Sequence, residues 1–89
     1  MMNYTFTMHG DPSQKLERIK TLAAQKGVTF NGNLKSGTFY GGIRIFGINK
    51  RISGSYTISG NRITVSVTEK PDSYTWDKIE SELRGFIEG

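Results

Sequence analysis

Few side chains in this sequence are able to do acid–base or metal chemistry, and they do not cluster. His9 is the single histidine and cysteine is absent, so a metal site would have to combine His9 with carboxylates that are dispersed along the chain. Zinc sites take three or four ligands, mostly from histidine and cysteine. We therefore predict no metal site, and we expect His9 to lie exposed at the end of a strand.

Motifs for nucleophilic or phosphate chemistry are equally scarce. No strand–turn–helix elbow presents a serine. The glycines of residues 36–42 (SGTFYGG) lack the spacing of a phosphate loop, and no Gly-Lys-Ser follows them. Glu80 and Arg84 are four residues apart, which is the spacing of an ordinary surface pair on a helix. We predict that the chain is not an enzyme and has neither catalytic residues nor a cofactor.

Residues 43–51 (IRIFGINKR) combine large apolar and basic side chains. Apolar residues ringed by basic ones suit an anionic lipid surface or the coat of a hydrophobic granule. The candidate binding residues are Ile43, Arg44, Ile45, Phe46, Ile48, Lys50 and Arg51, together with Arg62 further along the chain.

Ile43 and Ile45 alternate with Arg44, whereas the apolar residues that follow fall on the opposite parity. A bulge at Gly47 would account for this change, and so would a hairpin turn near Asn49-Lys50. A partly exposed loop and a pair of ordinary buried strands both fit the pattern. The sequence therefore leaves open whether residues 43–48 are buried or exposed.

The net charge of +4 is unevenly distributed. Between Asn33 and Lys70 six basic residues stand against Glu69 alone, which gives +5. From Pro71 onward two basic residues stand against five acidic ones, which gives −3. A basic segment attracts anionic partners.

Open sheet faces that carry basic and aromatic side chains bind single-stranded nucleic acid. The face expected to be open here is mostly serine and threonine, with Tyr40 and Arg62 as its possible exceptions. Nucleic-acid binding is therefore the alternative function. The first expectation is a small non-enzymatic binding or accessory module, without an identified ligand, that associates with hydrophobic granules or anionic lipid surfaces.

The composition indicates one globular domain over residues 1–89. Only 35% of the residues are hydrophobic, but 11% are aromatic, and large rings bury enough area to support a thin core. The N-terminus lacks the pattern of a signal peptide, and no apolar run approaches the roughly 20 residues that span a bilayer. We expect a soluble, cytoplasmic protein.

Residues 55–67 (SYTISGNRITVSV) predict a β-hairpin. With Gly60-Asn61 as a two-residue turn, Ser59 pairs with Arg62 and Ile58 with Ile63. In this register all apolar side chains fall on one face and all hydroxyl side chains on the other, and a shift by one residue would mix them. The remaining pairs are Thr57 with Thr64, Tyr56 with Val65, and Ser55 with Ser66.

A strand containing Tyr4, Phe6 and Met8 precedes a helix. Asp11 is expected as the N-cap, Pro12 as the first helical residue and Gln14 as the partner in a capping box. The helix carries one apolar stripe and ends at Gly27, a glycine suited to the left-handed conformation. Its stripe consists of Leu16, Ile19, Leu22 and Ala23, while Lys15, Arg18, Lys20 and Lys26 are expected elsewhere.

A short strand with Val28 and Phe30 inward should follow, with a turn at Asn31-Gly32, and then a strand over residues 36–42. A second amphipathic helix is expected around Trp76, Ile79, Leu83, Phe86 and Ile87. Gly85 lies inside it and costs about 1 kcal/mol relative to alanine, unless close packing against the sheet compensates.

Together these elements predict an α+β fold: a single antiparallel five-stranded sheet with two helices packed on one face, in the order β-α-β-β-β-β-α. Both helices have one apolar stripe and the sheet has one apolar face, so the hydroxyl face is left to water. The first helix should carry the first strand to an edge beside the last.

Residues 26–41 (KGVTFNGNLKSGTFYG), 52–71 (ISGSYTISGNRITVSVTEKP) and 76–87 (WDKIESELRGFI) resemble a bacterial family of small proteins of the polyhydroxyalkanoic acid system, or granule region. The shared features are a glycine-punctuated sheet, a Gly-Asn hairpin, a Lys-Pro exit and an amphipathic terminal helix. The resemblance implies association with polyester storage granules or another accessory role. It assigns no residue a catalytic role.

Overall fold

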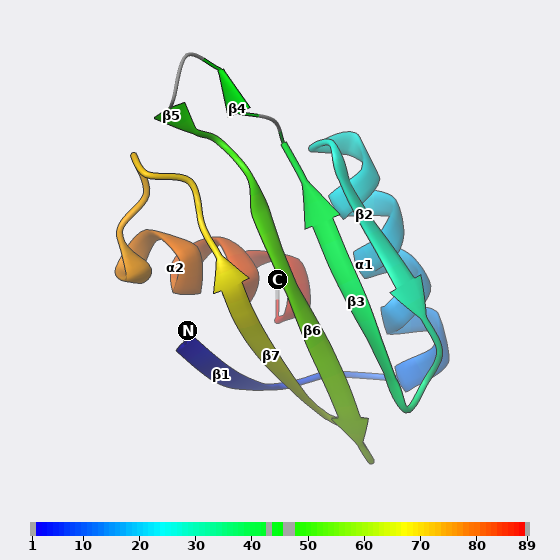
Figure 1. The fold of residues 1–89 in the computed structure, drawn as a ribbon. Helices are drawn as coiled ribbons and strands as arrows, with labels where there is room; N and C mark the ends of the chain where they lie inside the picture. Colours follow the sequence, from blue (N-terminus) through cyan, green and yellow to red (C-terminus); the bar gives the residue numbers. More distant parts are fainter. Residues whose placement is uncertain (1, 43, 46–47, 89) are drawn as a thin grey trace.

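The computed structural model describes residues 2–42, 44–45 and 48–88. It confirms the predicted α+β fold, with one five-stranded antiparallel sheet and both helices on the same face (Figure 1). A short extra pair of strands, β4 and β5, is inserted between β3 and β6. The elements are β1 (Met2–Thr7), α1 (Pro12–Gln25), β2 (Val28–Gly32), β3 (Ser36–Gly41), β4 (Arg44–Ile45), β5 (Ile48–Asn49), β6 (Ile52–Ser59), β7 (Arg62–Glu69) and α2 (Trp76–Ile87).

The strand order of the sheet is β1-β7-β6-β3-β2. The chain therefore crosses from one edge of the sheet to the other through α1, and the predicted place of the first strand, at an edge beside the last, is confirmed. Because β6 and β7 lie in the middle of the sheet, their hairpin organises both halves of the fold.

The β6–β7 hairpin has the predicted register at every pair, from Ser59 with Arg62 to Ser55 with Ser66. Gly60 at its turn has a φ of +62°, a left-handed conformation that glycine adopts without strain. The register shifts only at Ser53 and Gly54, near the end of the hairpin that is distant from the turn.

The core lies between the inner face of the sheet and the facing stripes of both helices. Leu16 of α1 is buried in this cluster and Trp76 of α2 packs against it, so the two helices cover the same side. The inner face of the sheet and the chain just after β1 contribute Tyr4, Phe6, Met8, Phe39, Tyr56, Ile63, Val65 and Val67, and the helices add Ile19, Ala23, Ile79, Leu83 and Ile87.

The N-termini of the two helices are capped in different ways. Asp11 is the N-cap of α1 and Pro12 its first residue, but the Asp11 side chain makes no capping hydrogen bond, so the predicted capping box is wrong. Lys15, expected off the apolar stripe, is only 9% exposed. In α2 the hydroxyl of Thr75 supplies the cap, accepting a hydrogen bond from the Lys78 N–H at 3.1 Å.

The predicted turn at Asn31-Gly32 is also wrong. Gly32 belongs to β2 and pairs with Gly37, and the turn lies one step later, closed by a 3.0 Å hydrogen bond from the Asn33 N–H to the Ser36 carbonyl. The Asn33 Oδ1 accepts from the N–H groups of Lys35 and Ser36 at 2.8 and 3.1 Å. Because the Asn33 side chain stabilises a turn at residues 33–36, the loop follows the Asn31-Gly32 pair instead of including it.

The face of the sheet opposite the helices, which is turned towards the viewer in Figure 1, carries the hydroxyl side chains. Thr57 is exposed and Thr64 half-buried, as expected for a face in water. Some hydroxyls bond across strands, as between Thr5 and Thr64 at 3.2 Å. The exposed Tyr40 lies on this face, and the expectation that both Thr57 and Thr64 stay out of the core is confirmed.

Tyr56 makes the stability of the fold sensitive to alkaline pH. Burial raises the pKa of its hydroxyl above the ordinary value of about 10, and the hydroxyl donates to the Asn33 carbonyl at 2.9 Å. Above pH ~10 the unfolded chain loses a proton that the folded chain keeps, so the free energy of unfolding falls as pH rises further. We expect Tyr56→Phe to reduce this fall, while costing about 1 kcal/mol at neutral pH through the lost hydrogen bond.

Urea unfolding at neutral pH and above pH ~10 measures both effects. Burial and the neighbouring carboxylates of Glu80 and Asp77 raise the pKa of Tyr4 as well, so part of the alkaline loss should remain in the Tyr56→Phe protein. An unchanged alkaline slope in that protein would contradict the role given to Tyr56.

Candidate functional site

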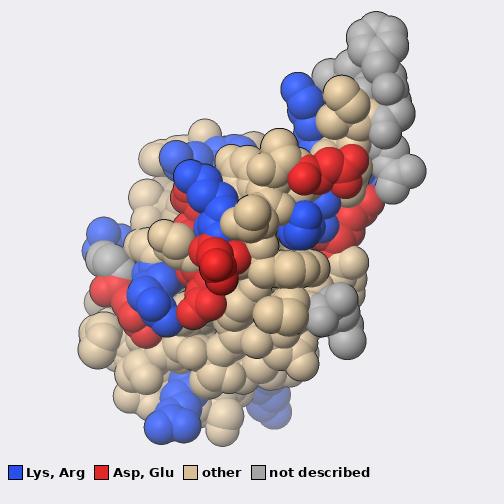
Figure 2. All heavy atoms as spheres, turned by 90° about the vertical axis from the view of Figure 1, so that its left-hand side faces the viewer, with Lys and Arg blue, Asp and Glu red and all other residues tan. Residues whose placement is uncertain are grey.

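Strands β4 and β5 form a two-stranded hairpin, called the arm here, that is not part of the main sheet. Arg44 pairs with Asn49 and Ile45 with Ile48. The arm continues beyond the ends of β3 and β6 (Figure 1), in a molecule that measures 42 × 21 × 20 Å. Figure 2 shows the described part of the arm standing away from the body, with basic atoms beside it and acidic atoms at its base.

The sequence left open whether residues 43–48 are buried or exposed, and the arm answers part of this question. Ile48 lies in a strand but is 53% exposed, so the segment is paired without burying this isoleucine. Of the alternatives left open, a turn near Asn49-Lys50 is excluded, because Asn49 is a strand residue. Ile43, Phe46 and the alternative of a bulge at Gly47 lie outside the described residues.

Asn49 ties the arm to the loop between β7 and α2. Its side-chain Nδ2 donates to the Lys70 carbonyl at 2.9 Å, and its Oδ1 accepts from the Arg51 N–H at 3.0 Å. Its backbone is held by Asp72, which accepts from the Asn49 N–H at 3.1 Å and donates its own N–H to the Asn49 carbonyl at 2.9 Å. Three of these hydrogen bonds, those with Lys70 and Asp72, therefore fix the base of the arm on the body, and the bond from Arg51 shapes the link between the arm and β6.

The basic residues beside the arm differ in how strongly they interact with neighbouring groups of the protein. Lys50 and Arg51 are both exposed. The Arg51 Nε lies 3.8 Å from a carboxylate oxygen of Glu69, which makes a weak, solvent-exposed pair. The Lys70 ammonium lies 5.5 Å from the centre of the Trp76 ring. Lys50 has no partner among the described residues, so its charge is available to an anion.

Arg62 does not belong to this group. It follows the Gly60-Asn61 turn, whereas the arm joins β6 at its opposite end, so the whole of the eight-residue strand β6 separates them. At about 3.3 Å per residue that is roughly 25 Å. The structure thus brings together the candidate residues of 44–51 that it describes and leaves Arg62 apart.

The distance between the basic residues at the two ends of the sheet also affects whether the open face could bind nucleic acid. Lys35 and Arg62 lie at the turn end of the sheet, and Lys50, Arg51 and Lys70 at the arm end. Between them the open face consists mainly of hydroxyl side chains. A single-stranded nucleic acid needs a continuous basic track with stacking rings, and the described part of this face does not provide one.

A groove opens at the base of the arm and is called the arm-side groove here. Its volume is about 260 Å³, and it lies between the end of α1, the arm and α2. Two lysines, Lys26 and Lys50, stand on it beside mostly apolar side chains. The other lining residues are Val28, Gly42, Ile52, Pro71, Tyr74, Ile79, Glu82, Leu83 and Phe86.

Beneath the groove lies a smaller cavity of about 40 Å³, lined by apolar side chains alone. An apolar cavity of this kind stays dry. The groove and the cavity share Val28, Ile52, Leu83 and Phe86. The apolar floor of the groove is therefore also the roof of the cavity.

Sequence reasoning did not find the arm-side groove. Val28 and Phe86 were expected to face the core, and both are only half-buried because they lie at the ends of their elements. No motif signals the site, since its residues come from segments as distant as Lys26 and Tyr74.

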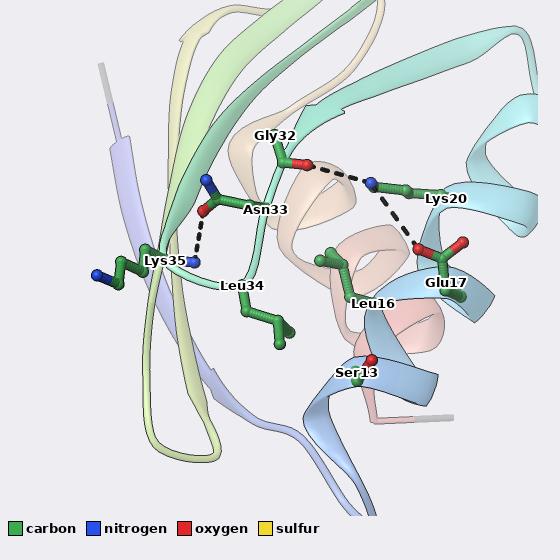
Figure 3. Close-up of a pocket in the computed structure, with 8 residues that line it drawn as sticks. All are labelled: Ser13, Leu16, Glu17, Lys20, Gly32, Asn33, Leu34 and Lys35. Atoms are coloured by element: carbon green, nitrogen blue, oxygen red, sulfur yellow. Dashed lines mark hydrogen bonds and ion pairs between the residues drawn. The ribbon is translucent and has the colours of Figure 1, made fainter.

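A second hollow, of about 480 Å³, separates α1 from the β2–β3 turn (Figure 3). Leu16 and Leu34 face it from opposite sides. The Lys20 ammonium donates a hydrogen bond to the Gly32 carbonyl at 3.3 Å and lies 4.0 Å from a carboxylate oxygen of Glu17. The Lys35 side chain points away from the hollow in Figure 3. Its charged groups therefore do not converge on a ligand.

Acidic and histidine side chains do not gather anywhere in the described ranges to form a group of three that would hold a metal ion. His9 is exposed just beyond β1, as expected. Neither α1 nor α2 is long and apolar enough to cross a membrane. The chain matches no protein-family model, no curated protein and no solved structure.

Proposed function

We propose that this domain is a non-catalytic binding module that attaches through the arm to an anionic, apolar surface such as the lipid coat of a hydrophobic granule. The observation that supports it most directly is the exposed Ile48 on an arm that stands away from the body and is fixed at its base. The resemblance to granule-region proteins agrees with this partner and stays a prediction.

The energy of such attachment has an apolar and an electrostatic part. Burial of an exposed isoleucine contributes about 1.5–3 kcal/mol. A lysine or arginine close to an anionic leaflet contributes about 1 kcal/mol, and Lys50 and Arg51 lie within three residues of Ile48. Neither part alone gives stable binding, and together they give a reversible association that weakens with salt.

The bonds of Asn49 add to the affinity without touching the surface. An arm already fixed on the body loses less conformational freedom on binding than a loose loop does. The acidic residues of α2 do not oppose the contact strongly, because several are paired within the helix, as Glu82 is with Lys78 at 3.4 Å and Glu80 with Arg84 at 3.1 Å.

Co-sedimentation with phospholipid vesicles tests the proposal. The protein should sediment with vesicles containing phosphatidylglycerol, and less with vesicles of phosphatidylcholine alone. Ile48→Asp should weaken binding to anionic vesicles about tenfold, because it removes the apolar contact and adds a like charge. Raising salt from low to physiological concentration should weaken the wild-type protein further.

Leu34→Asp is the matched control. Leu34 is 44% exposed, close to the value for Ile48, but it lies in the β2–β3 turn at the other end of the sheet. It should leave vesicle binding unchanged. Equal losses in the two variants, or wild-type sedimentation no better than that of Ile48→Asp, would contradict attachment through the arm.

The separation of Lys35 and Arg62 from the basic residues at the arm does not favour the nucleic-acid alternative. A nucleic-acid complex held by phosphate contacts would weaken steeply with salt, and fluorescence anisotropy with a labelled oligonucleotide would detect it.

A further inference from the structure

The arm-side groove has the properties of a site for a small amphiphile. Its walls are formed by large apolar side chains that are only half-buried, among them Val28, Ile52 and Phe86, so a ligand there would remove apolar surface from water. Together with the cavity beneath it, the space approaches the lower end of the ~300–1,000 Å³ that small-molecule pockets occupy. Such a space takes a single chain but not a folded segment of another protein.

The charged side chains on the rim of the arm-side groove determine which charge the head group of a ligand should carry. Lys26 and Lys50 are exposed on the groove, and no described residue forms an ion pair with either of them. Glu82 also lines the groove, but the Lys78 ammonium lies 3.4 Å from its carboxylate and offsets its charge. The rim therefore favours an anion, while the floor and the cavity below favour a hydrocarbon.

We infer that the arm-side groove binds a single-chain alkyl carboxylate, with the carboxylate at Lys26 and Lys50 and the chain along Val28, Ile52 and Phe86 towards the cavity. A neutral lipid would leave the lysines without a partner, and an alkylammonium would be repelled by them. A short carboxylate would meet the lysines without filling the apolar floor. The ligand class thus follows from both halves of the groove.

This inference does not depend on vesicle attachment. The arm would contact a surface through Ile48, which does not line the groove, whereas the groove would bind a monomeric ligand in solution. Failure of one proposal therefore leaves the other standing.

Isothermal titration calorimetry and two-dimensional NMR of the full chain test the inference, with octanoate as the probe below its micelle-forming concentration. Octanoate should bind saturably and shift the resonances of Val28, Ile52 and Leu83. Butyrate, octan-1-ol and octylamine should each bind at least about tenfold more weakly, because butyrate lacks the chain, octan-1-ol lacks the charge and octylamine carries the opposite charge.

The double variant Lys26→Glu with Lys50→Glu should weaken octanoate binding about tenfold, since each exposed ion pair contributes up to about fivefold and reversal adds repulsion. The matched control is Arg18→Glu with Lys35→Glu, which makes the same change of net charge away from the groove and should bind as the wild type does. Octan-1-ol should bind the two double variants equally.

Three results would overturn the inference: octanoate binding no tighter than butyrate binding, shifts confined to residues outside the groove, or equal loss in the two double variants. A thermal melt of each variant shows whether it is folded. If Lys26→Glu with Lys50→Glu does not fold, Val28→Phe replaces it, because a larger side chain on the groove wall should block octanoate without changing the charge.

Discussion

Replacing Gly37 with alanine is expected to lower the free energy of unfolding by about 3 kcal/mol, because β3 has no room for a side chain at this position. A Cβ atom there would overlap the carbonyl oxygen of Asn31 and lie 2.6 Å from Cε1 of Tyr56. The carbonyl belongs to the paired strand β2. The Tyr56 ring is fully buried and anchored through its hydroxyl to Asn33, so neither neighbour gives way cheaply.

Gly85→Ala is the matched control for this substitution. Gly85 lies in the exposed part of α2, and apart from its own stretch of helix no described atom lies within 4 Å of the position its Cβ would take, so the expectation that close packing explains this glycine is wrong. Alanine should therefore stabilise the helix by about 1 kcal/mol.

In thermal melts the Gly37→Ala protein should lose roughly 12–24 °C in Tm, and the Gly85→Ala protein should gain roughly 4–8 °C. A Gly37→Ala protein as stable as the wild type would show that Tyr56 does not pack against β3 as described.

Asn49→Ala is the second large expected effect, and it links stability to function. The substitution removes the hydrogen bonds to the Lys70 carbonyl and from the Arg51 N–H, at about 1 kcal/mol each, so the free energy of unfolding should fall by about 2 kcal/mol. The arm then loses one of the three hydrogen bonds that join Asn49 to the body, and the local bond from Arg51 as well. Hydrogen exchange at the amides of Ile45 and Ile48 should become faster.

Binding to anionic vesicles should also weaken about fivefold in Asn49→Ala, because the loosened arm has more freedom to lose on contact. Asn33→Ala offers a close control, since the Asn33 side chain also takes part in two hydrogen bonds, both accepted from backbone N–H groups, but in the turn at the other end of the sheet. Both variants should lose stability and only Asn49→Ala should lose vesicle affinity. Equal vesicle affinities in the two proteins would show that the arm needs no fixed base.

The β6–β7 hairpin shows what the sequence was able to predict. Its apolar and hydroxyl residues alternate without exception around a two-residue turn, so one register alone separates them. The amphipathic stripes of α1 and α2 were equally decisive, because each has only one face to bury. From these local patterns the layer arrangement and the place of β1 followed.

The turn after β2 shows where local patterns fail. Asn31-Gly32 is a strong hairpin signal, but Gly32 and Gly37 are both needed as strand residues beneath the Tyr56 ring. That contact joins residues more than 15 positions apart, and its demand for space outweighs the turn preference. Asn33 then closes the turn with its own side chain, an arrangement that the sequence does not distinguish in advance.

The candidate sites depend still more on tertiary structure. The parity change within residues 43–51 was consistent with a loop, a bulge, a turn or buried strands, and only the pairing of Ile45 with Ile48 and the exposure of Ile48 distinguish among them. The arm-side groove assembles Lys26, Lys50 and Phe86 from three distant segments. Neither spacing nor composition reveals such a meeting point.

The most direct test of surface attachment uses the absence of cysteine from the chain. A single cysteine introduced as Ile48→Cys, or as Leu34→Cys for comparison, can carry one environment-sensitive fluorophore. With vesicles that contain phosphatidylglycerol and a nitroxide-labelled lipid, we predict strong quenching and a blue shift for the fluorophore at position 48 and neither change at position 34. Equal quenching at both positions, or none at position 48, would contradict attachment through the arm.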